Sequence, residues 1–338
     1  MEGIKMDPIR IDGIQPGAAL PGGEFTIRGS HLMEAQQRPE ILFGEVKGSV
    51  VIGSESMVVA RVPDSASTPE LIVRHAGGET SPYPCAIGIQ IADALHPVAS
   101  PAVDAEGNIF TTFSGSRGQK TSVSVFEIDT NYQCKAFNSD IMNATGLAFD
   151  SNGLLHVSSR NDGAVFQVSS TGAAKLFVEG MGIATGLCFD PAGNLYVGDR
   201  SGTVFKVDPS GDVFVFATLE PSISAYHLAY GPGGQIYVTG PTTSSHDSVY
   251  RIAPDGSVET FYRGLGRPQG IAFDRNGNLY VCASWRGKRG VVRISPSAEA
   301  EHFLSGHGIV GLAFLPSRSL AIATTNSIYR VDVDIAGL

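Results

Sequence analysis

The sequence predicts an all-β protein in which a small β-sandwich at residues 7–84 precedes a six-bladed β-propeller at residues 86–338. The first observation is a phrase that recurs six times across 95–338, most plainly as ATGLAFDSNGLLHV at 144–157, ATGLCFDPAGNLYV at 184–197 and PQGIAFDRNGNLYV at 268–281. Its equivalent positions lie 40 to 46 residues apart, at Val103, Phe149, Phe189, Tyr230, Phe273 and Phe314. The second observation is that each period holds only short strand patterns, which is typical of propeller blades.

Residues 7–84 lack this period. They contain short alternating segments separated by glycine and proline, namely IRIDGI, EFTIRG, ILFGEV, MVVARVP and ELIVRHA. Such segments predict the strands of a sandwich.

Each repeat predicts four antiparallel strands. A first strand such as GLAFD ends at an aspartate, and the following x-x-Gly-Asn predicts a tight turn, because aspartate accepts backbone N–H bonds and glycine supplies a positive φ. The second strand (LYV or LHV), a loop of variable length, the third strand (VFQV, VFKV, VYRI) and an outer strand such as VFVFATL complete the blade.

The last repeat provides only three strands before residue 338. The segment AIGIQIAD at 86–93 alternates Ile87, Ile89 and Ile91 and belongs to no repeat. We therefore predict that 86–93 completes the last blade and leaves no open sheet edge. On this view the ring folds without 1–84 but not without 1–94.

Composition narrows the classes of partner. The chain of 338 residues has 42% hydrophobic residues, 17% charged residues and a formal net charge of −9. This charge argues against nucleic acid and anionic membrane, because both require dense Lys/Arg surfaces. The chain as written carries no apolar leader or 18-residue apolar run, which predicts a cytoplasmic protein, although a leader removed earlier would leave no trace.

The four cysteines show no metal-ligand spacing. Cys188 and Cys282 fit buried strand positions, and the sequence leaves open whether Cys85 pairs with Cys134.

Two resemblances follow from these residues. The order IDGIQPGAALPGGEFTIRGSHL, FGEV, VVARVP resembles the IPT/TIG immunoglobulin-like domains, which implies an immunoglobulin-like β-sandwich that serves as a spacer or docking module. The repeated phrase resembles the NHL-repeat and SMP-30/gluconolactonase class of six-bladed propellers. That resemblance implies a fold rather than an activity, because the same ring hosts hydrolases, lyases, synthases and binding scaffolds.

The loops between second and third strands vary in length, whereas the turns between first and second strands are short. Variation on one face predicts a ligand pocket there. Three loops differ most: 114–122 with Arg117 and Lys120, 240–248, and 283–290, in which Trp285 adjoins Arg286, Lys288 and Arg289. Cations beside an indole favour a carboxylate or phosphate, with a solvated loop as the alternative.

The resemblance to metal-dependent lactone hydrolases implies asparagine and aspartate before the glycine of the first strand. Those positions here are occupied by Ala99, Thr145, Thr185, Tyr226, Gln269 and Val310. Hard cations require several carboxylate or carbonyl oxygens. We therefore predict no catalytic metal, although loop acids such as Asp162 and Asp199 remain available. Nucleotide motifs are absent too, so no cofactor is predicted.

Tyr226 and His227 replace the Thr-Gly of neighbouring repeats. We expect His227 to act as general acid or base and Tyr226 with Gln269 to donate hydrogen bonds to a developing oxyanion. A structural histidine is the alternative. His246 and Asp247 are a weaker candidate pair, because adjacent residues in an extended segment point in opposite directions.

The sequence thus favours a metal-independent small-molecule enzyme, a hydrolase, lyase or cyclase, acting at the channel mouth. A non-catalytic ligand- or protein-binding propeller, with the sandwich docking a partner, is the alternative, and a metal-dependent lactonase is the second alternative. The predicted ligand has an anionic or strongly polar end and lies between Trp285 with Arg286 and Tyr226 with His227. Further predicted contacts are Gln269, Thr145, Thr185 and Arg117.

Overall fold

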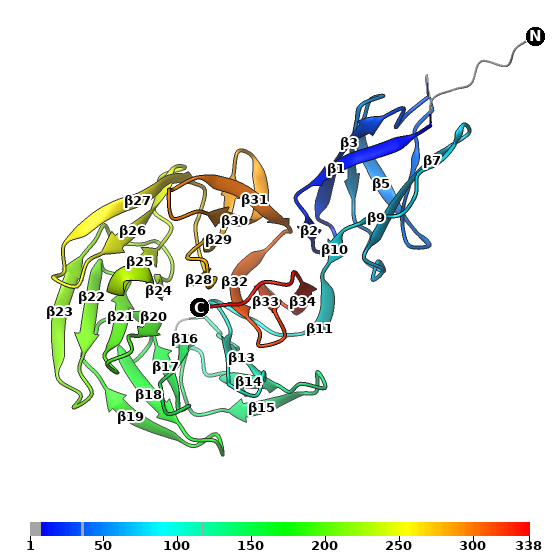
Figure 1. The fold of residues 1–338 in the computed structure, drawn as a ribbon. Coiled ribbons are helices and arrows are strands. Elements are labelled where there is room, and N and C mark those ends of the chain that lie inside the picture. The colour runs from blue at the N-terminus through cyan, green and yellow to red at the C-terminus, as the bar shows by residue number, and fades with distance from the viewer. Residues whose placement is uncertain (1–7, 35–36, 117) are drawn as a thin grey trace, which may run out of the picture.

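The computed structural model describes residues 8–34, 37–116 and 118–338 as two all-β domains, a sandwich and a ring of sheets (Figure 1). The only helical segment in these ranges is the short 3-10 turn η1 (Pro232–Gly234). Within the same ranges there is no helix of the length and apolarity needed to cross a membrane.

The N-terminal sandwich has two halves that share strand β5 (Val46–Gly53). The first part of β5 pairs with β4 (Glu40–Phe43), and its second part pairs with β6 (Met57–Arg61). The other strands are β1 (Arg10–Gln15), β3 (Glu24–Ser30), β7 (Glu70–His75), β8 (Gly78–Glu79) and β9 (Tyr83–Pro84). Inward-facing apolar side chains, among them Phe25, Ile27 and Phe43, form one core.

Five sheets of the ring have four strands each. In chain order, four of them are β12 (Ala102–Val103), β13 (Ile109–Thr112), β14 (Val125–Ile128) and β15 (Cys134–Asn138); β16 (Ala144–Phe149), β17 (Leu155–Ser159), β18 (Ala164–Val168) and β19 (Ala174–Val178); β20 (Ala184–Phe189), β21 (Leu195–Asp199), β22 (Thr203–Val207) and β23 (Val213–Thr218); and β24 (His227–Gly231), β25 (Gln235–Thr239), β26 (Asp247–Ile252) and β27 (Val258–Leu265). The fifth holds β11 (Ile89–Ala92), β34 (Ile328–Asp332), β33 (Ser319–Thr324) and β32 (Ile309–Phe314).

The predicted count of six separate four-stranded blades is wrong: five sheets have that form. The remaining repeat forms β28 (Ile271–Phe273), β29 (Leu279–Trp285), β30 (Lys288–Ile294) and β31 (Ala300–Ser305) within a six-stranded sheet. Strand β2 (Ala18–Ala19) runs parallel to β31, and β10 (Ala86–Ile87) runs parallel to β2. The sandwich therefore covers the outer edge that this repeat would otherwise expose.

Segment 86–93 is divided between two sheets rather than forming one strand. Residues 86–87 extend the six-stranded sheet as β10, whereas β11 pairs antiparallel with β34, placing Gln90 opposite Tyr329. The change occurs at Gly88, whose N–H donates to the Ala19 carbonyl at 2.9 Å. Ile87 consequently belongs to the core of the sandwich.

The aspartate–glycine turns form as the residues require. In the second repeat Asp150 Oδ1 accepts the Asn152 and Leu154 N–H groups, each at 2.9 Å, and Gly153 has a φ of 75°. These uniform turns lie on what we call the lower face. The variable loops and the crossovers between sheets lie on the opposite, upper face.

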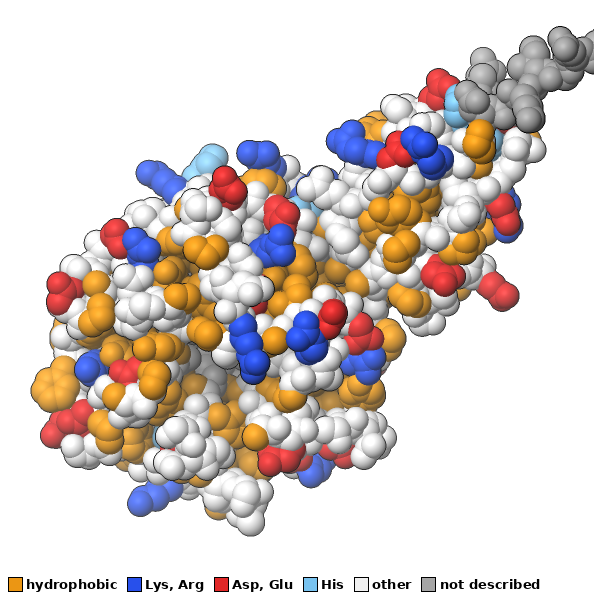
Figure 2. Space-filling model, in the orientation of Figure 1, with side chains coloured by type: hydrophobic (Ala, Val, Ile, Leu, Met, Phe, Trp, Pro, Cys, Tyr) orange, Lys and Arg blue, Asp and Glu red, His pale blue; other side chains and the backbone are white. Residues whose placement is uncertain are grey.

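The lower face opens into an apolar channel of about 690 Å³, lined by inner-strand residues such as Leu187, Leu228 and Phe273. The C-terminal segment crosses this opening, and Leu338 N–H donates to the Phe273 carbonyl at 3.0 Å. Figures 1 and 2 show this segment at the centre of the ring and the hydrophobic side chains around the hollow.

Candidate functional site on the upper face

A pocket of about 310 Å³ opens on the upper face between the six-stranded sheet and the last sheet. Three segments form it: the crossover at 266–269, the hairpin between β29 and β30, and the crossover at 306–309. Its polar side chains are Arg267, Gln269, Ser284 and Arg289. This is the size of a small-molecule pocket at the lower end of the usual range.

Arg267 occupies this pocket in an unusual backbone conformation. Its φ of 49° lies in the left-handed region, which is uncommon for a residue with a side chain. Gly266 on one side holds a two-way backbone pair with Ser284, at 2.7 and 2.9 Å, and Pro268 follows on the other. The conformation is thus fixed by its neighbours, as strained residues at functional sites often are.

Gln269 is held from both sides. Its N–H donates to the Cys282 carbonyl at 2.8 Å, and its carbonyl accepts the Thr239 hydroxyl at 2.5 Å. Its half-buried side chain lines the pocket. Arg289 lies opposite, and its carbonyl accepts the N–H of Gly306 at 3.2 Å.

Neither guanidinium of the pocket has an acidic partner within the described ranges. Arginine binds carboxylates and phosphates with two parallel hydrogen bonds. Two arginines, an amide and a hydroxyl around one small cavity can therefore hold an anionic group together with adjacent hydroxyls.

Thr145 and Thr185 are buried and used for internal bonding. The Thr145 hydroxyl donates to the Asn143 carbonyl at 3.0 Å, and the Thr185 hydroxyl donates to the Gly198 carbonyl at 2.8 Å. The Thr185 hydroxyl also accepts the Tyr226 N–H at 3.1 Å. Thr185 thus links β20 to β21 and to the residue before β24, whereas the Thr145 bond is local to its own segment.

Tyr226 is 1% exposed and packs between two sheets of the ring. The missing side chains of Gly198 and Gly240 make room for its ring, since an added Cβ would lie 2.8 Å and 2.5 Å from Tyr226 atoms. Its hydroxyl donates to the Glu220 carbonyl. Burial, together with the charge of Glu220, raises the pKa of the phenol, so the hydroxyl keeps its proton, which it already donates within the ring of sheets.

His227 begins β24 and is 4% exposed. Burial lowers the pKa of its imidazole to about 4, so the ring is neutral at pH 7. No residue in the described ranges hydrogen-bonds to either ring nitrogen. The ring is therefore in its base form, although a pKa of about 4 makes it a weaker base than an exposed histidine.

Trp285 and Arg286 form a pair of their own. The Arg286 guanidinium lies over the indole, 4.4 Å from the ring centroid, and the Trp285 Nε1–H donates to the Tyr262 hydroxyl at 2.8 Å. Tyr262 belongs to the outer strand β27. In the structure, therefore, the indole packs at the outer edge of the ring, and no described contact joins it to Tyr226 or His227.

The other predicted residues are dispersed. Arg117 lies outside the described residues. Asp247 is 3% exposed and bonded to Thr242, while its neighbour His246 is exposed. Asp162 and Asp199 accept hydrogen bonds from serines of their own loops.

The ligand set of a hard cation is not found at the channel mouth. Within 8–34, 37–116 and 118–338, no three His, Cys, Asp or Glu side chains converge as a metal site would require. The four cysteines are free thiols. The residues thus do not match the donors that the resemblance to metal-dependent lactonases implies.

Among the residues that line this pocket, the sequence predicts a contact role for Gln269 and draws attention to Arg289 beside Trp285, but it does not point to Arg267. The signal was present in the segment GLGRPQG, where an arginine stands between glycine and proline in a crossover of the upper face.

Comparison with known proteins supports both domains. Residues 8–87 match the family model of the IPT/TIG domain, so the sandwich is a TIG domain in front of a propeller. The curated proteins contain no match to the chain.

Solved structures similar to the chain include a gluconolactonase from Xanthomonas campestris, at 17% identity, covering 73% of this chain and 89% of that one with a TM-score of 0.62. An auxiliary nutrient binding protein from Bacteroides ovatus matches at 13% identity over 96% of this chain and 98% of that one, with a TM-score of 0.57. A catalytically inactive virginiamycin B lyase from Staphylococcus aureus, in which a histidine is replaced by alanine, matches at 12% identity over 89% of this chain and 97% of that one, with a TM-score of 0.54. These likenesses show the fold alone.

Proposed function

We propose that this protein binds a small carboxylate-bearing molecule in the upper-face pocket. The main support is that Arg267 and Arg289 line one small cavity together with Gln269. Among the described residues, neither guanidinium has an acidic partner. In a chain of net charge −9, an unpaired arginine couple is a specific feature rather than general surface charge. Hydroxyl groups of the ligand next to its carboxylate would form hydrogen bonds with the side chains of Gln269 and Ser284.

The two-domain arrangement supports a binding role. The nutrient binding protein resembles this chain over both domains, whereas the gluconolactonase resembles about three quarters of it. Binding also accounts for the local chemistry, because the pocket contains donors for an anion and no paired nucleophile and base.

Calorimetric titration with gluconate and glucuronate, with glucose as the uncharged comparison, tests the proposal. We expect the sugar acids to bind and glucose not to bind at this pocket. Replacing Arg267 or Arg289 by alanine should weaken binding by about 1.5–3 kcal/mol, the worth of a charge-assisted hydrogen bond. Arg263→Ala, an exposed arginine on β27, is the matched control and should leave affinity unchanged. Equal affinity for the sugar acids in the unchanged protein and all three variants would place the site elsewhere.

A second candidate is the metal-independent hydrolase, lyase or cyclase predicted from the sequence, with His227 as the general base. It is favoured by the neutral, unpartnered imidazole of His227. The similarity to a lyase that is inactive when a histidine becomes alanine adds support. In this case His227→Gln should lower kcat by at least about a hundredfold with KM little changed. Lactone hydrolysis at the same rate in the unchanged protein and in His227→Gln would exclude His227 as the general base.

A further inference from the structure

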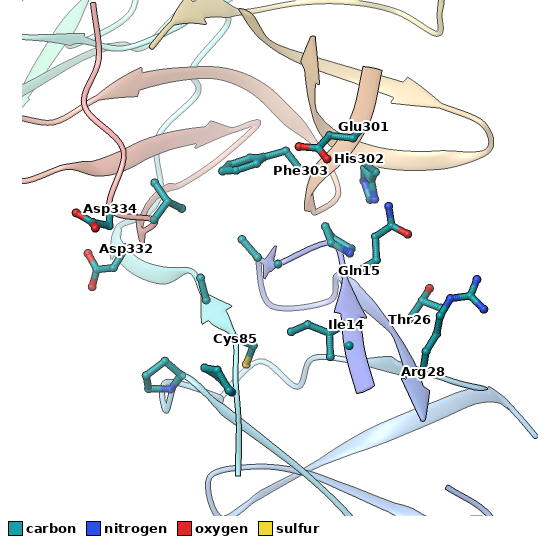
Figure 3. Close-up of a pocket in the computed structure, with 18 residues that line it drawn as sticks. Ile14, Gln15, Thr26, Arg28, Cys85, Glu301, His302, Phe303, Asp332 and Asp334 are labelled. Carbon is teal, nitrogen blue, oxygen red and sulfur yellow. The ribbon is translucent and has the colours of Figure 1, made fainter. Parts of the chain in front are cut away.

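A second and larger cavity lies between the two domains. It has a volume of about 920 Å³. One wall consists of residues 13–18 and 84–86 of the TIG domain, and the other consists of Glu301, His302 and Phe303 of β31 and residues 332–334 (Figure 3). We call it the inter-domain cleft.

The walls of the cleft are held at a fixed distance by backbone bonds. Strand β2 pairs with β31, the Leu20 N–H donates to the Ser305 carbonyl at 2.8 Å, and Glu24 N–H donates to the Ser305 hydroxyl at 2.9 Å. At the far end Lys288 Nζ donates to the Thr26 hydroxyl at 3.3 Å. The cleft is therefore preformed, as ligand pockets usually are.

The acids of the cleft are already neutralised. Glu301 pairs with Arg293, Asp332 pairs with Arg330 at 2.7 Å, and Asp334 pairs with Arg318 at 2.5 Å. An anionic ligand would meet three carboxylates, and a cationic ligand would meet carboxylates whose charge is already offset by arginine. The three ion pairs thus leave the carboxylates with little net charge, and the exposed Arg28 is a further cation at the opposite wall.

The cleft nevertheless offers hydrogen-bonding groups. His302 Nε2 lies 3.2 Å from the Arg289 carbonyl, so this nitrogen carries the proton and Nδ1 is an acceptor. Nδ1 is buried and has no partner among the described residues. Burial, the largest cause, lowers the pKa of His302, which keeps the ring neutral. Gln15 and Arg28 at the opposite wall add donors.

Apolar surface lies between these polar groups. Phe303, Ile14 and Pro16 line the cleft. The half-buried ring of Phe303 also packs edge-on against Tyr280, with the ring centroids 4.9 Å apart. Aromatic rings pack against the apolar C–H faces of flat ligands.

We propose that the inter-domain cleft binds a neutral oligosaccharide of two or three sugar units. Sugar hydroxyls both donate and accept, so they match the carboxylate oxygens and the Gln15 and Arg28 donors at once. The C–H faces of the sugar rings match Phe303 and Pro16. The volume is at the upper end of that of small-molecule pockets, which suits a ligand longer than one ring. This site is separate from the upper-face pocket and does not depend on its function.

The test uses the full chain with maltotriose and cellotriose as probes. Binding is measured by titration calorimetry and by the NMR shifts of the Gln15 and Thr26 amides. The cleft is blocked by Gly17→Phe, because no atom lies within 4 Å of a Cβ added at Gly17. Gly13→Phe, equally open, is the second blocking variant. Ser49→Phe adds the same ring to β5, outside the cleft, as the matched control.

We expect at least one trisaccharide to bind and both blocking variants to weaken it at least tenfold. Ser49→Phe and Arg267→Ala should bind it as the unchanged protein does, and the second of these separates this site from the upper-face pocket. The proposal is overturned if neither trisaccharide shifts the cleft amides at about 20 mM, or if the blocking variants that fold bind as tightly as the control. Tighter binding of a glucuronate-containing trisaccharide than of its neutral counterpart would contradict the class of ligand.

Discussion

The six-stranded sheet differs from the five four-stranded sheets in what surrounds it. In the four-stranded sheets the outermost strand is an open edge, as in β23, where Val213, Phe214 and Val215 are 39%, 54% and 68% exposed. In the six-stranded sheet the outer edge of β31 is covered by β2, and Leu20 of the TIG domain joins the core of the ring. Both the upper-face pocket and the inter-domain cleft border this sheet. Regular repeats thus build the ring, and the irregular sheet borders both proposed binding sites.

The largest expected effect comes from removing the TIG domain. The sequence predicts that a chain lacking 1–84 still folds, but the structure places Ala18 and Leu20 in the core shared by β29, β30 and β32. We now expect this deletion to lower the stability of the ring by several kcal/mol. The further deletion of 1–94 also removes β11 and should abolish cooperative unfolding. Thermal melts of both shortened chains measure this, and equal melting temperatures for the full and shortened chains would contradict it.

A single substitution tests the contribution of the covered edge of the six-stranded sheet without removing the TIG domain. Leu20→Ala should cost about 2–5 kcal/mol, the usual cost of truncating a buried leucine. Leu176→Ala on the exposed edge strand β19, where the side chain is 45% exposed, should cost less than about 0.5 kcal/mol. Urea unfolding of the two variants gives the difference directly. A similar loss in both would mean that the six-stranded sheet is no more tightly built than the others.

The next effect concerns pH. The folded state holds the pKa of His227 at about 4, below the ordinary 6.5, so the unfolded chain binds a proton more readily. Stability therefore falls as pH drops below about 6.5 and continues to fall toward 4; between pH 7.5 and 5 the His227 share is about 2 kcal/mol.

Burial lowers the pKa of His156 and His302 as well, which adds to the same trend. His227→Gln should reduce the pH slope of the unfolding free energy, while His246→Gln, at an exposed position, should leave it unchanged. An unaltered slope in His227→Gln would show that this histidine is already accessible to protons.

The smallest expected effect is at the loop that the sequence singled out. Arg286 is exposed and contacts the indole of its own neighbour, so Arg286→Ala should change stability by less than about 0.5 kcal/mol and leave sugar-acid affinity unchanged. A tenfold loss of affinity would instead restore this loop to the binding site, as the sequence predicts.

Much of the fold could be predicted because it repeats. The Asp, Gly and Asn of the turn recur with the period. The role of each depends only on contacts within its own turn, so it can be predicted without the rest of the fold. Strands β2 and β10 could not be predicted, because two-residue strands have no periodicity. The parallel pairing of β2 with β31 also joins residues more than 280 positions apart, as between Ala18 and Leu304.

The candidate site was predictable only in part. Gln269 follows from its position before the first-strand glycine, a position that the repeat identifies. Tyr226 occupies the equivalent position, but its ring turns between sheets because Gly198 and Gly240 leave space there. Those glycines stand where other repeats have larger residues, such as Ser158 and Cys282 in place of Gly198. Comparing neighbouring repeats pairwise would have indicated the packing. Arg267 lies outside the repeat, so no periodic signal reports it.

The pairing of β11 with β34 also determines when the ring can be completed. Gln90 meets Tyr329, so the strand made early must wait for one made more than two hundred residues later. During synthesis at about 5–20 residues per second, this interval is on the order of ten to fifty seconds. Contacts of such sequence separation form slowly, because the chain loses loop entropy before the contact stabilises it. Closing the last sheet is therefore expected to be the late step of folding, and until then β11 and the partly made ring keep open edges that other chains can pair with.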